Sequence, residues 1–199
     1  MNRATQDPAE YKKGSTPQMP RTGLRRIPHV TCIVITVLLL VGGMASAQDV
    51  PESTLKAAFI YNFAKFTEWP ASVVAATKPL AFCVIGDPAV GDALEQAVRG
   101  RMLGGHTLGV SQVAPIGPPR GCHVLYLSGV TVAAAAQFVA VLRDEPVLTM
   151  SDVEGFTDRG GIAQCFFEHG QLRFNIRLES VTRARLQISS RLLVLARLR

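Results

Sequence analysis

The sequence contains few of the side chains that bind metals, and it lacks the patterns typical of nucleic-acid-binding proteins. Four Cys and four His are spread over 199 residues. Beyond residue 47, His106, His123 and His169 have no His, Cys or carboxylate at ligand spacing, apart from Cys165 near His169. A zinc site needs about four ligands, so we expect no metal and no cofactor. Because no basic stripe with interleaved aromatic residues is present, we expect no nucleic-acid partner.

The chain has only one long apolar run, and it lies near the N-terminus. A basic patch at 21–26 precedes the apolar residues 33–41, and Ala-Ser-Ala follows at 45–47. This order is typical of a cleaved secretory signal, which would make Gln48 the first mature residue. The alternative, an uncleaved anchor, is disfavoured because a bilayer span needs about 20 apolar residues. Cys32 stands at the start of the run instead of its end, which argues against a lipoprotein.

The expected organisation is therefore an N-terminal extension with a signal over 1–47 and a single α/β domain over 48–199. Residues 1–18 are polar and fit no part of a signal, so Met19 is a candidate for the true start. The removed part carries six of the 21 Lys and Arg but only two of the 15 Asp and Glu, so the remainder is close to neutral. We expect a soluble domain located in the periplasm, large enough for one core.

The segment 55–70 (LKAAFIYNFAKFTEWP) predicts an amphipathic helix that opens the domain and ends at Trp69. At 100° per residue its first Leu and three Phe share one face, which we interpret as core, and Lys56 falls at an edge or on the far side. Asn62 falls within the apolar face and would need a partner. Since Trp is enriched at interface hot spots, Asn62 and Trp69 are candidate partner anchors. The alternative for Trp69 is an aromatic side chain packed on the sheet.

The middle of the chain alternates short apolar runs with helical patterns. Buried strands are predicted at 80–85, at 122–127 and from 146–149, a half-exposed strand at 107–113, and helices at 90–98 and 131–142. Such a rhythm predicts an α/β fold, with a largely parallel sheet flanked by helices.

The pattern changes after residue 161. The runs 162–167 and 172–176 predict a C-terminal antiparallel hairpin, because His169 and Gly170 are too few for a parallel crossover. Leucines at helical spacing over 189–199 predict a closing helix.

Three cysteines follow residue 47. Cys83 lies in the first buried strand and Cys122 begins the second, and such strands are commonly neighbours in a parallel sheet. We therefore expect a Cys83–Cys122 disulfide in an oxidising compartment. The alternative is two buried thiols that act as small apolar residues. Cys165 is then either free and buried, or paired with another chain.

No catalytic pattern withstands inspection. The segment 86–91 has the glycine spacing of a phosphate loop but lacks its Lys and Ser/Thr. Ser128 lacks the preceding Gly of a nucleophile elbow, and Ser151 or Asp152 is better explained as a turn residue. We therefore expect a protein that is not an enzyme. A ligand or partner cleft would lie at the carboxyl ends of the strands, and its candidate residues are Gly86, Asp87, Ser128, Ser151 and Asp152.

Six segments together resemble one known family. They are 55–70, 82–88 (FCVIGDP), 122–128 (CHVLYLS), 146–156 (PVLTMSDVEGF), 160–176 (GGIAQCFFEHGQLRFNI) and 188–197 (ISSRLLVLAR). In this order the chain is similar to the YfiR family of periplasmic regulators over nearly all of its mature length.

The resemblance implies an exported α/β domain without catalytic activity. The best-understood members bind the periplasmic part of an inner-membrane diguanylate cyclase and hold it inactive, and their release raises cyclic di-GMP and promotes biofilm formation. An outer-membrane lipoprotein can sequester the repressor. Cys83 and Cys122 stand where the family's structural bridge would lie. Cys165 matches a position that pairs with an upstream cysteine, but the residues 156–161 contain none.

The resemblance leaves the partner open. We expect the periplasmic domain of a diguanylate cyclase, with a sensor kinase as the alternative target, and a homodimer is a further partner to consider. The second hypothesis for function is a periplasmic small-molecule-binding protein that feeds a sensor kinase or receptor.

Overall fold

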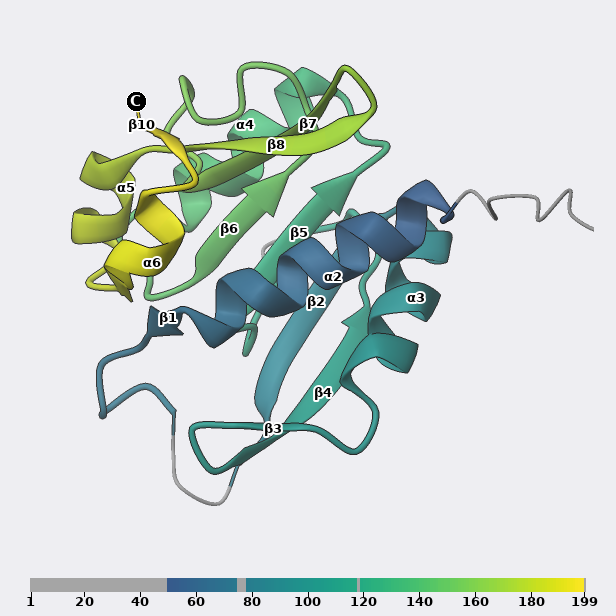
Figure 1. Cartoon of the computed structure of the whole chain (residues 1–199). Helices are drawn as coiled ribbons and strands as arrows, with labels where there is room; N and C mark the ends of the chain where they lie inside the picture. The colour runs from purple at the N-terminus through teal and green to yellow at the C-terminus, as the bar shows by residue number, and fades with distance from the viewer. Residues whose placement is uncertain (1–49, 75–77, 118, 199) are drawn as a thin grey trace, which may run out of the picture. The chain divides into compact units, whose positions relative to one another are not determined.

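The computed structural model describes residues 50–74, 78–117 and 119–198, and Figure 1 shows their arrangement. The predicted signal over 1–47 and the candidate start at Met19 lie outside the described residues. Six strands form the main sheet and two further pairs of residues extend it. The strands of this sheet are β2 (Leu80–Gly86), β3 (Met102–Leu103), β4 (His106–Gln112), β5 (Val124–Ser128), β6 (Leu148–Ser151), β7 (Ala163–Glu168), β8 (Gln171–Ile176) and β10 (Arg197–Leu198).

The sheet has the order β10-β8-β7-β6-β5-β2-β4-β3. Its centre is parallel from β4 through β2, β5 and β6 to β7, whereas β8 runs antiparallel to β7 and β3 antiparallel to β4. Helices α2 (Glu52–Lys65), α3 (Pro88–Val98) and α4 (Val132–Val141) flank it. The α/β class, the parallel sheet and the C-terminal antiparallel hairpin are therefore confirmed.

Alternation along the central strands builds two cores, one on each face of the sheet. Phe82 and Val84 of β2 belong to the core that α2 and α3 cover, whereas Cys83 and Ile85 belong to the core under α4. Figure 1 shows α2 in front of the sheet and α4 behind it. Because both faces are buried, the strands are continuous apolar runs, as is typical of parallel sheets.

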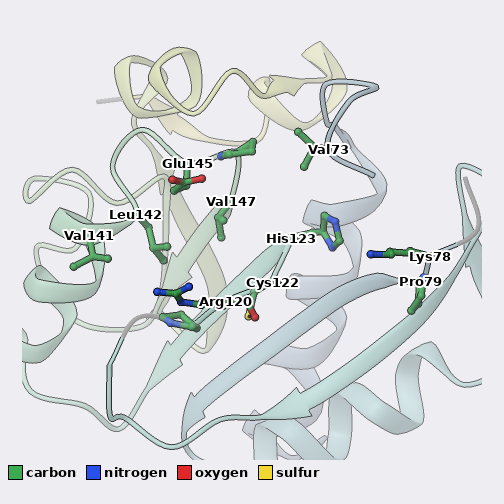
Figure 2. A pocket seen from close by; sticks show the side chains of 13 residues that line it. Val73, Lys78, Pro79, Arg120, Cys122, His123, Val141, Leu142, Glu145 and Val147 are labelled. Atoms are coloured by element: carbon green, nitrogen blue, oxygen red, sulfur yellow. The ribbon is translucent and has the colours of Figure 1, made fainter. Parts of the chain in front are cut away.

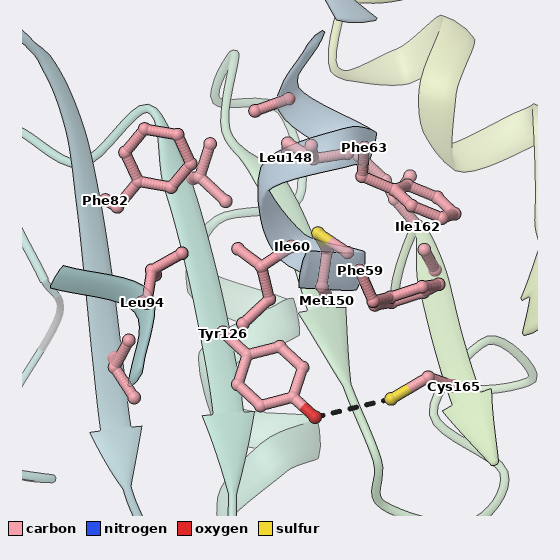
Figure 3. Close-up of a cluster of buried hydrophobic side chains, with 14 of the residues drawn as sticks. Phe59, Ile60, Phe63, Phe82, Leu94, Tyr126, Leu148, Met150, Ile162 and Cys165 are labelled. Carbon is pink, nitrogen blue, oxygen red and sulfur yellow. Dashed lines mark hydrogen bonds between the residues drawn. The ribbon is translucent and has the colours of Figure 1, made fainter. Parts of the chain in front are cut away.

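The register extends the first core across the sheet. Val84 pairs with Tyr126, Tyr126 with Met150, and Met150 with Ala163, so one row of side chains crosses four strands. Figure 3 shows Phe59, Ile60 and Phe63 of α2 packed over this row. The Phe59 and Phe63 ring centroids lie 4.4 Å apart.

The face of α2 that packs on the sheet differs from the predicted one. Asn62 is exposed, and Lys56, expected at an edge, is buried. The prediction was centred on the phenylalanines, but the helix is turned toward Ile60, where the small side chains of Ala57 and Ala64 allow close approach to the sheet. The buried polar group of this helix is therefore an ammonium instead of an amide.

The end of the first helix also differs from the prediction. Helix α2 stops at Lys65, and Thr67–Glu68 forms strand β1, which pairs antiparallel with β9 (Gln187–Ile188). The carbonyl of Phe63 at the helix end accepts from the hydroxyl of Thr67 at 2.8 Å and from the amide of Phe66 at 3.1 Å. Trp69 therefore lies beyond the helix, in the loop that leads to β2.

The predicted closing helix over 189–199 is wrong in its extent. The structure has a four-residue helix α6 (Ser190–Leu193), after which Arg197–Leu198 pairs with β8 as β10. Val194 and Leu195 are 83% and 70% exposed, so leucine spacing here does not reflect packing. A further short helix, α5 (Leu178–Arg183), was not predicted.

Local sequence signals explain several element boundaries. Asp87 accepts a hydrogen bond from the Ala89 amide and caps α3, and Thr131 accepts one from the Ala134 amide and caps α4. In the hairpin, His169 has a φ of 50° and is followed by Gly170 at 75°. Two consecutive positive φ values match the two-residue turn that suits antiparallel strands.

The structure contains the Cys83–Cys122 disulfide, with the two Cα atoms 5.8 Å apart. It joins β2 to the residues that lead into β5, and these strands are neighbours as predicted. Cys165 of β7 is free and buried, which agrees with the first of its two sequence interpretations.

Replacing both Cys83 and Cys122 with Ala is expected to lower the free energy of unfolding by about 4 kcal/mol, because the bridge closes a loop of 39 residues in the unfolded chain. Urea unfolding of oxidised protein measures the difference. As a control, a reducing agent should destabilise the natural sequence but not the double variant. Equal stability of the two proteins without reductant would contradict the prediction, as would a Cys122–Cys165 linkage in non-reducing peptide mapping.

Candidate functional site

The carboxyl ends of β2, β5 and β6 bring together three of the predicted cleft residues. Gly86 of β2 pairs with Ser128 of β5. A Cβ atom on Gly86 would stand 1.7 Å from the Ser128 carbonyl oxygen, and its φ is +102°, so only glycine fits there. The Ser128 hydroxyl donates to Asp152 Oδ2 at 2.6 Å. Gly86, Ser128 and Asp152 therefore form one cluster at this edge.

The other two predicted residues have local structural tasks. The Ser151 hydroxyl donates to the carbonyl of Leu127 at 2.8 Å and accepts from the amide of Val153 at 3.0 Å, and the residue is fully buried. It therefore stabilises the turn after β6, which agrees with its interpretation from sequence. Asp87 caps α3 through the Ala89 amide at 2.9 Å.

Lys56 of α2 completes the cluster, although its position in the sequence predicts an edge or the far side of the helix. Its Nζ lies 2.6 Å from Asp152 Oδ2 and 2.5 Å from Glu52 Oε1, and the residue is 8% exposed. Burial acts to lower the pKa of Lys56, but the hydrogen bonds to Asp152 and Glu52 outweigh it and leave that pKa above its usual value. The ammonium is thus charged at neutral pH, and it lies at the edge where the cleft was expected.

Beneath this cluster lies a buried pair of titratable groups. Tyr126 Oη is 3.3 Å from Cys165 Sγ, as the dashed line in Figure 3 marks. Burial, the largest effect, raises the pKa of Cys165 to about 11, and burial likewise raises the pKa of Tyr126. A protonated thiol is a poor nucleophile. Cys165, Lys56 and Asp152 also line a cavity of about 270 Å³.

Within 50–74, 78–117 and 119–198, no group of three or more His, Cys, Asp or Glu is placed to hold a metal ion. The same part of the chain has no helix with the length and apolar character that a bilayer crossing demands.

A further cavity, with a volume of about 710 Å³, lies at the opposite, amino ends of β5 and β6. Figure 2 shows that His123, Lys78 and Pro79 lie on one side and Val141 and Leu142 on the other, with Arg120 and Cys122 between them. The disulfide therefore borders this cavity. The sequence does not predict this cavity, because its residues come from the loop before β2, the segment before β5, and the end of α4 with the segment that leads to β6.

His123 anchors one wall of this cavity through its backbone and its ring. Its Nδ1 accepts a hydrogen bond from the Ala81 amide at 2.9 Å, and its carbonyl accepts from Trp69 Nε1 at 3.3 Å. Burial is the main cause that lowers the pKa of His123; nearby His106 acts in the same direction, and a backbone hydrogen bond with Val73 opposes it. The folded state therefore favours the neutral form of the His123 ring over the protonated form.

The two candidate partner anchors lie in different surroundings. Trp69 is half-buried, packs against the core and donates to the carbonyl of His123. With Leu80, Leu103 and His106 it also lines a cavity of about 560 Å³. Asn62 is exposed on α2. The packing of Trp69 agrees with its alternative interpretation, and contact of either residue with a partner stays a prediction.

Comparison with known proteins assigns the family. A family model described as YfiR/HmsC-like matches residues 53–197. The chain belongs to the YfiR/HmsC-like family, which confirms the resemblance seen in the sequence. A search of curated proteins gives no match.

A solved structure resembles the fold. The chain is similar to a conserved domain protein from Vibrio cholerae, with a TM-score of 0.52 and 11% sequence identity over 75% of this chain and 60% of that one. The present chain thus spans about 60% of the length of that protein, and the likeness concerns the fold alone.

The geometry of His123 predicts a pH-dependent stability. A histidine with a folded-state pKa below its ordinary value of 6.5 stabilises the fold fully above pH 6.5, and this contribution is lost as the pH falls through the lower folded-state pKa. In His123→Asn, an amide oxygen replaces Nδ1 as acceptor without titrating. The urea midpoint should therefore fall less between pH 7.5 and 5.5 in this variant than in the natural sequence.

A matched control is His169→Asn, because Asn tolerates the positive φ of the hairpin turn. This control should keep the pH dependence of the natural sequence. An equal loss of stability on acidification in His123→Asn and the natural sequence would contradict the assignment.

Proposed function

We propose that this chain is an exported, non-enzymatic regulator that binds the periplasmic sensor part of an inner-membrane signalling protein and represses it. The family match over 53–197 carries the proposal, because the family that the sequence resembles consists of periplasmic regulators. The Cys83–Cys122 disulfide supports an oxidising compartment such as the periplasm.

The chemistry of the described residues supports a non-enzymatic role. Ser128 donates to a carboxylate, and Ser151 is fully buried and donates to a backbone carbonyl, so neither hydroxyl is paired with a histidine base. Cys165 has its pKa raised to about 11, which keeps the thiol protonated near neutral pH. Ser128, Ser151 and Cys165 are the nucleophile candidates at the carboxyl ends of the strands and in the core beneath them. Each takes part in packing or hydrogen bonding instead.

The favoured target is a diguanylate cyclase that controls cyclic di-GMP and biofilm formation, and a sensor kinase is the alternative. Repression requires that the regulator binds the inactive state of its target more tightly than the active state. A shift from mostly active to mostly inactive target takes a difference in affinity of about 10⁴-fold. An outer-membrane lipoprotein that captures the regulator would reverse the shift by mass action, and a homodimer would present the binding surface twice.

For the contact surface we propose the region around Trp69 together with exposed Asn62 on α2. The indole is fixed by its hydrogen bond to the carbonyl of His123, so it enters a complex with little loss of conformational freedom. Aromatic side chains held in this way are typical interface anchors.

A second candidate function is small-molecule binding that feeds a sensor kinase or receptor. The observation that favours it is the cavity of about 710 Å³ beside the disulfide, which has both apolar walls and the basic side chains of Lys78 and Arg120. Its volume lies within the range of about 300–1,000 Å³ that is usual for ligand pockets.

Deletion of the gene should raise cellular cyclic di-GMP and biofilm formation, because the cyclase loses its repressor. Mass spectrometry of nucleotide extracts measures the change. Re-expression of the chain with its N-terminal segment should restore the original level, whereas a matched chain without residues 1–47 should not, since it would stay in the cytoplasm.

An unchanged cyclic di-GMP level after deletion would contradict the cyclase as target. Restoration by the chain without its signal would contradict a periplasmic site of action.

A further inference from the structure

The basic residues of the second half of the chain are all arginine. No lysine follows Lys78, whereas nine arginines lie between 143 and 199. Arginine presents a planar fork of donors that fits a phosphate or carboxylate group, and lysine does not. Four of these arginines meet at one place in the fold.

The place is a cavity of about 280 Å³ between the end of α4, the turn at 158–160 and the start of α5. We call it the arginine pocket. It is lined by Arg143, Arg159, Arg177 and Arg183, by Asp158 and Glu179, and by Val139, Ala140 and Gly160. Four guanidinium groups therefore face two carboxylates, which leaves a net positive charge of two at neutral pH.

Glu179 neutralises one side of the arginine pocket. Its carboxylate accepts from Arg177 at 2.7 Å and also pairs with Arg183, and these contacts hold the pKa of Glu179 below its usual range. The carboxylate of Glu179 thus already occupies the position between Arg177 and Arg183.

The other side keeps free donors. Arg159 uses Nη1 for the carbonyls of Glu154 and Gly155, at 3.3 and 2.8 Å, and its Nη2 makes no hydrogen bond in the described structure. Across the described residues, Arg143 has neither a hydrogen bond nor an ion pair. Both side chains are exposed to solvent. Two guanidinium groups with unused donors therefore line a concave site of positive charge.

We propose that the arginine pocket binds a phosphate-type oxyanion, held by Arg143 and Arg159 in the field of Arg177 and Arg183. Charge-assisted, bidentate hydrogen bonds are the strongest that arginine makes. The apolar side chains of Val139 and Ala140 leave the anion no competing acceptor on that wall. Glu179 is an internal competitor that weakens binding. This site lies outside the residues assigned to partner contact above and goes beyond the proposed function.

Inorganic phosphate, a small phosphomonoester and the headgroup of an anionic phospholipid share this chemistry. The proposal is tested by titrating the purified protein with each probe: sodium phosphate, glycerol phosphate, and vesicles with or without phosphatidylglycerol. Calorimetry or thermal shift is compared with sodium chloride at equal ionic strength, because screening alone changes the stability of charged surfaces. The probes that give saturable binding show whether the bound anion is free phosphate, a phosphomonoester or a lipid headgroup.

Two variants with opposite expected effects separate binding from general charge effects. Arg143→Gln should weaken phosphate-type binding about tenfold, because it removes a whole set of donors. Glu179→Gln should tighten it severalfold, because Arg177 and Arg183 lose their internal anion. Arg99→Gln, on an exposed arginine at the end of α3, is the control and should change nothing.

Several outcomes would overturn the proposal. One is the absence of saturable binding by every probe in both the natural sequence and Glu179→Gln. Another is an equal loss in Arg143→Gln and Arg99→Gln. A third is binding of an acidic peptide without binding of phosphate, glycerol phosphate or lipid, which would make the arginine pocket a contact for a protein partner.

Discussion

The ion pair between Lys56 and Asp152 fixes the position of the first helix on the sheet. Lys56 is the only charged residue among the buried side chains of the described structure, and its ammonium reaches a carboxylate that follows β6 in the chain. Asp152 also accepts from Ser128 at the end of β5. One carboxylate thus joins α2 to two neighbouring strands. Because an unpaired buried ammonium is strongly unfavourable, rotation of α2 to the orientation that would bury Asn62 is excluded while the pair exists.

This constraint also decides where binding sites lie. In an open α/β sheet, ligands usually bind beyond the carboxyl ends of the strands, but here the ion pair of Lys56 and Asp152 lies at that edge, beside cavities of about 270 and 480 Å³. A cavity of about 710 Å³ lies at the amino ends, beside the Cys83–Cys122 disulfide and the half-buried His123. A regulator that acts through its outer surface is compatible with an ion pair at this edge, and the arginine pocket lies at a third location.

The elements of the fold could largely be predicted because apolar runs and turn residues report local structure. The buried strands, the hairpin at His169 and the Cys83–Cys122 pair are examples. Features that depend on contacts between distant residues could not be predicted. A lysine in a helix is normally solvated, so only its proximity to Asp152, 96 residues away, reveals that Lys56 is buried. Likewise, leucine spacing near the C-terminus predicts a helix, although strand β8 offers a free edge that Arg197–Leu198 occupies instead.

The most direct test is a double-mutant cycle in urea with Lys56→Met, Asp152→Asn and both together, and with Lys65→Met as a control on the exposed side of the same helix. The side chains of Lys56 and Asp152 are 10% and 20% exposed. We predict that each single variant lowers the free energy of unfolding by about 2 kcal/mol. The double variant should lose less than the sum by at least about 1 kcal/mol, and Lys65→Met should be nearly neutral. Strict additivity, or single variants as stable as the natural sequence, would contradict the claim that this ion pair positions α2 on the sheet.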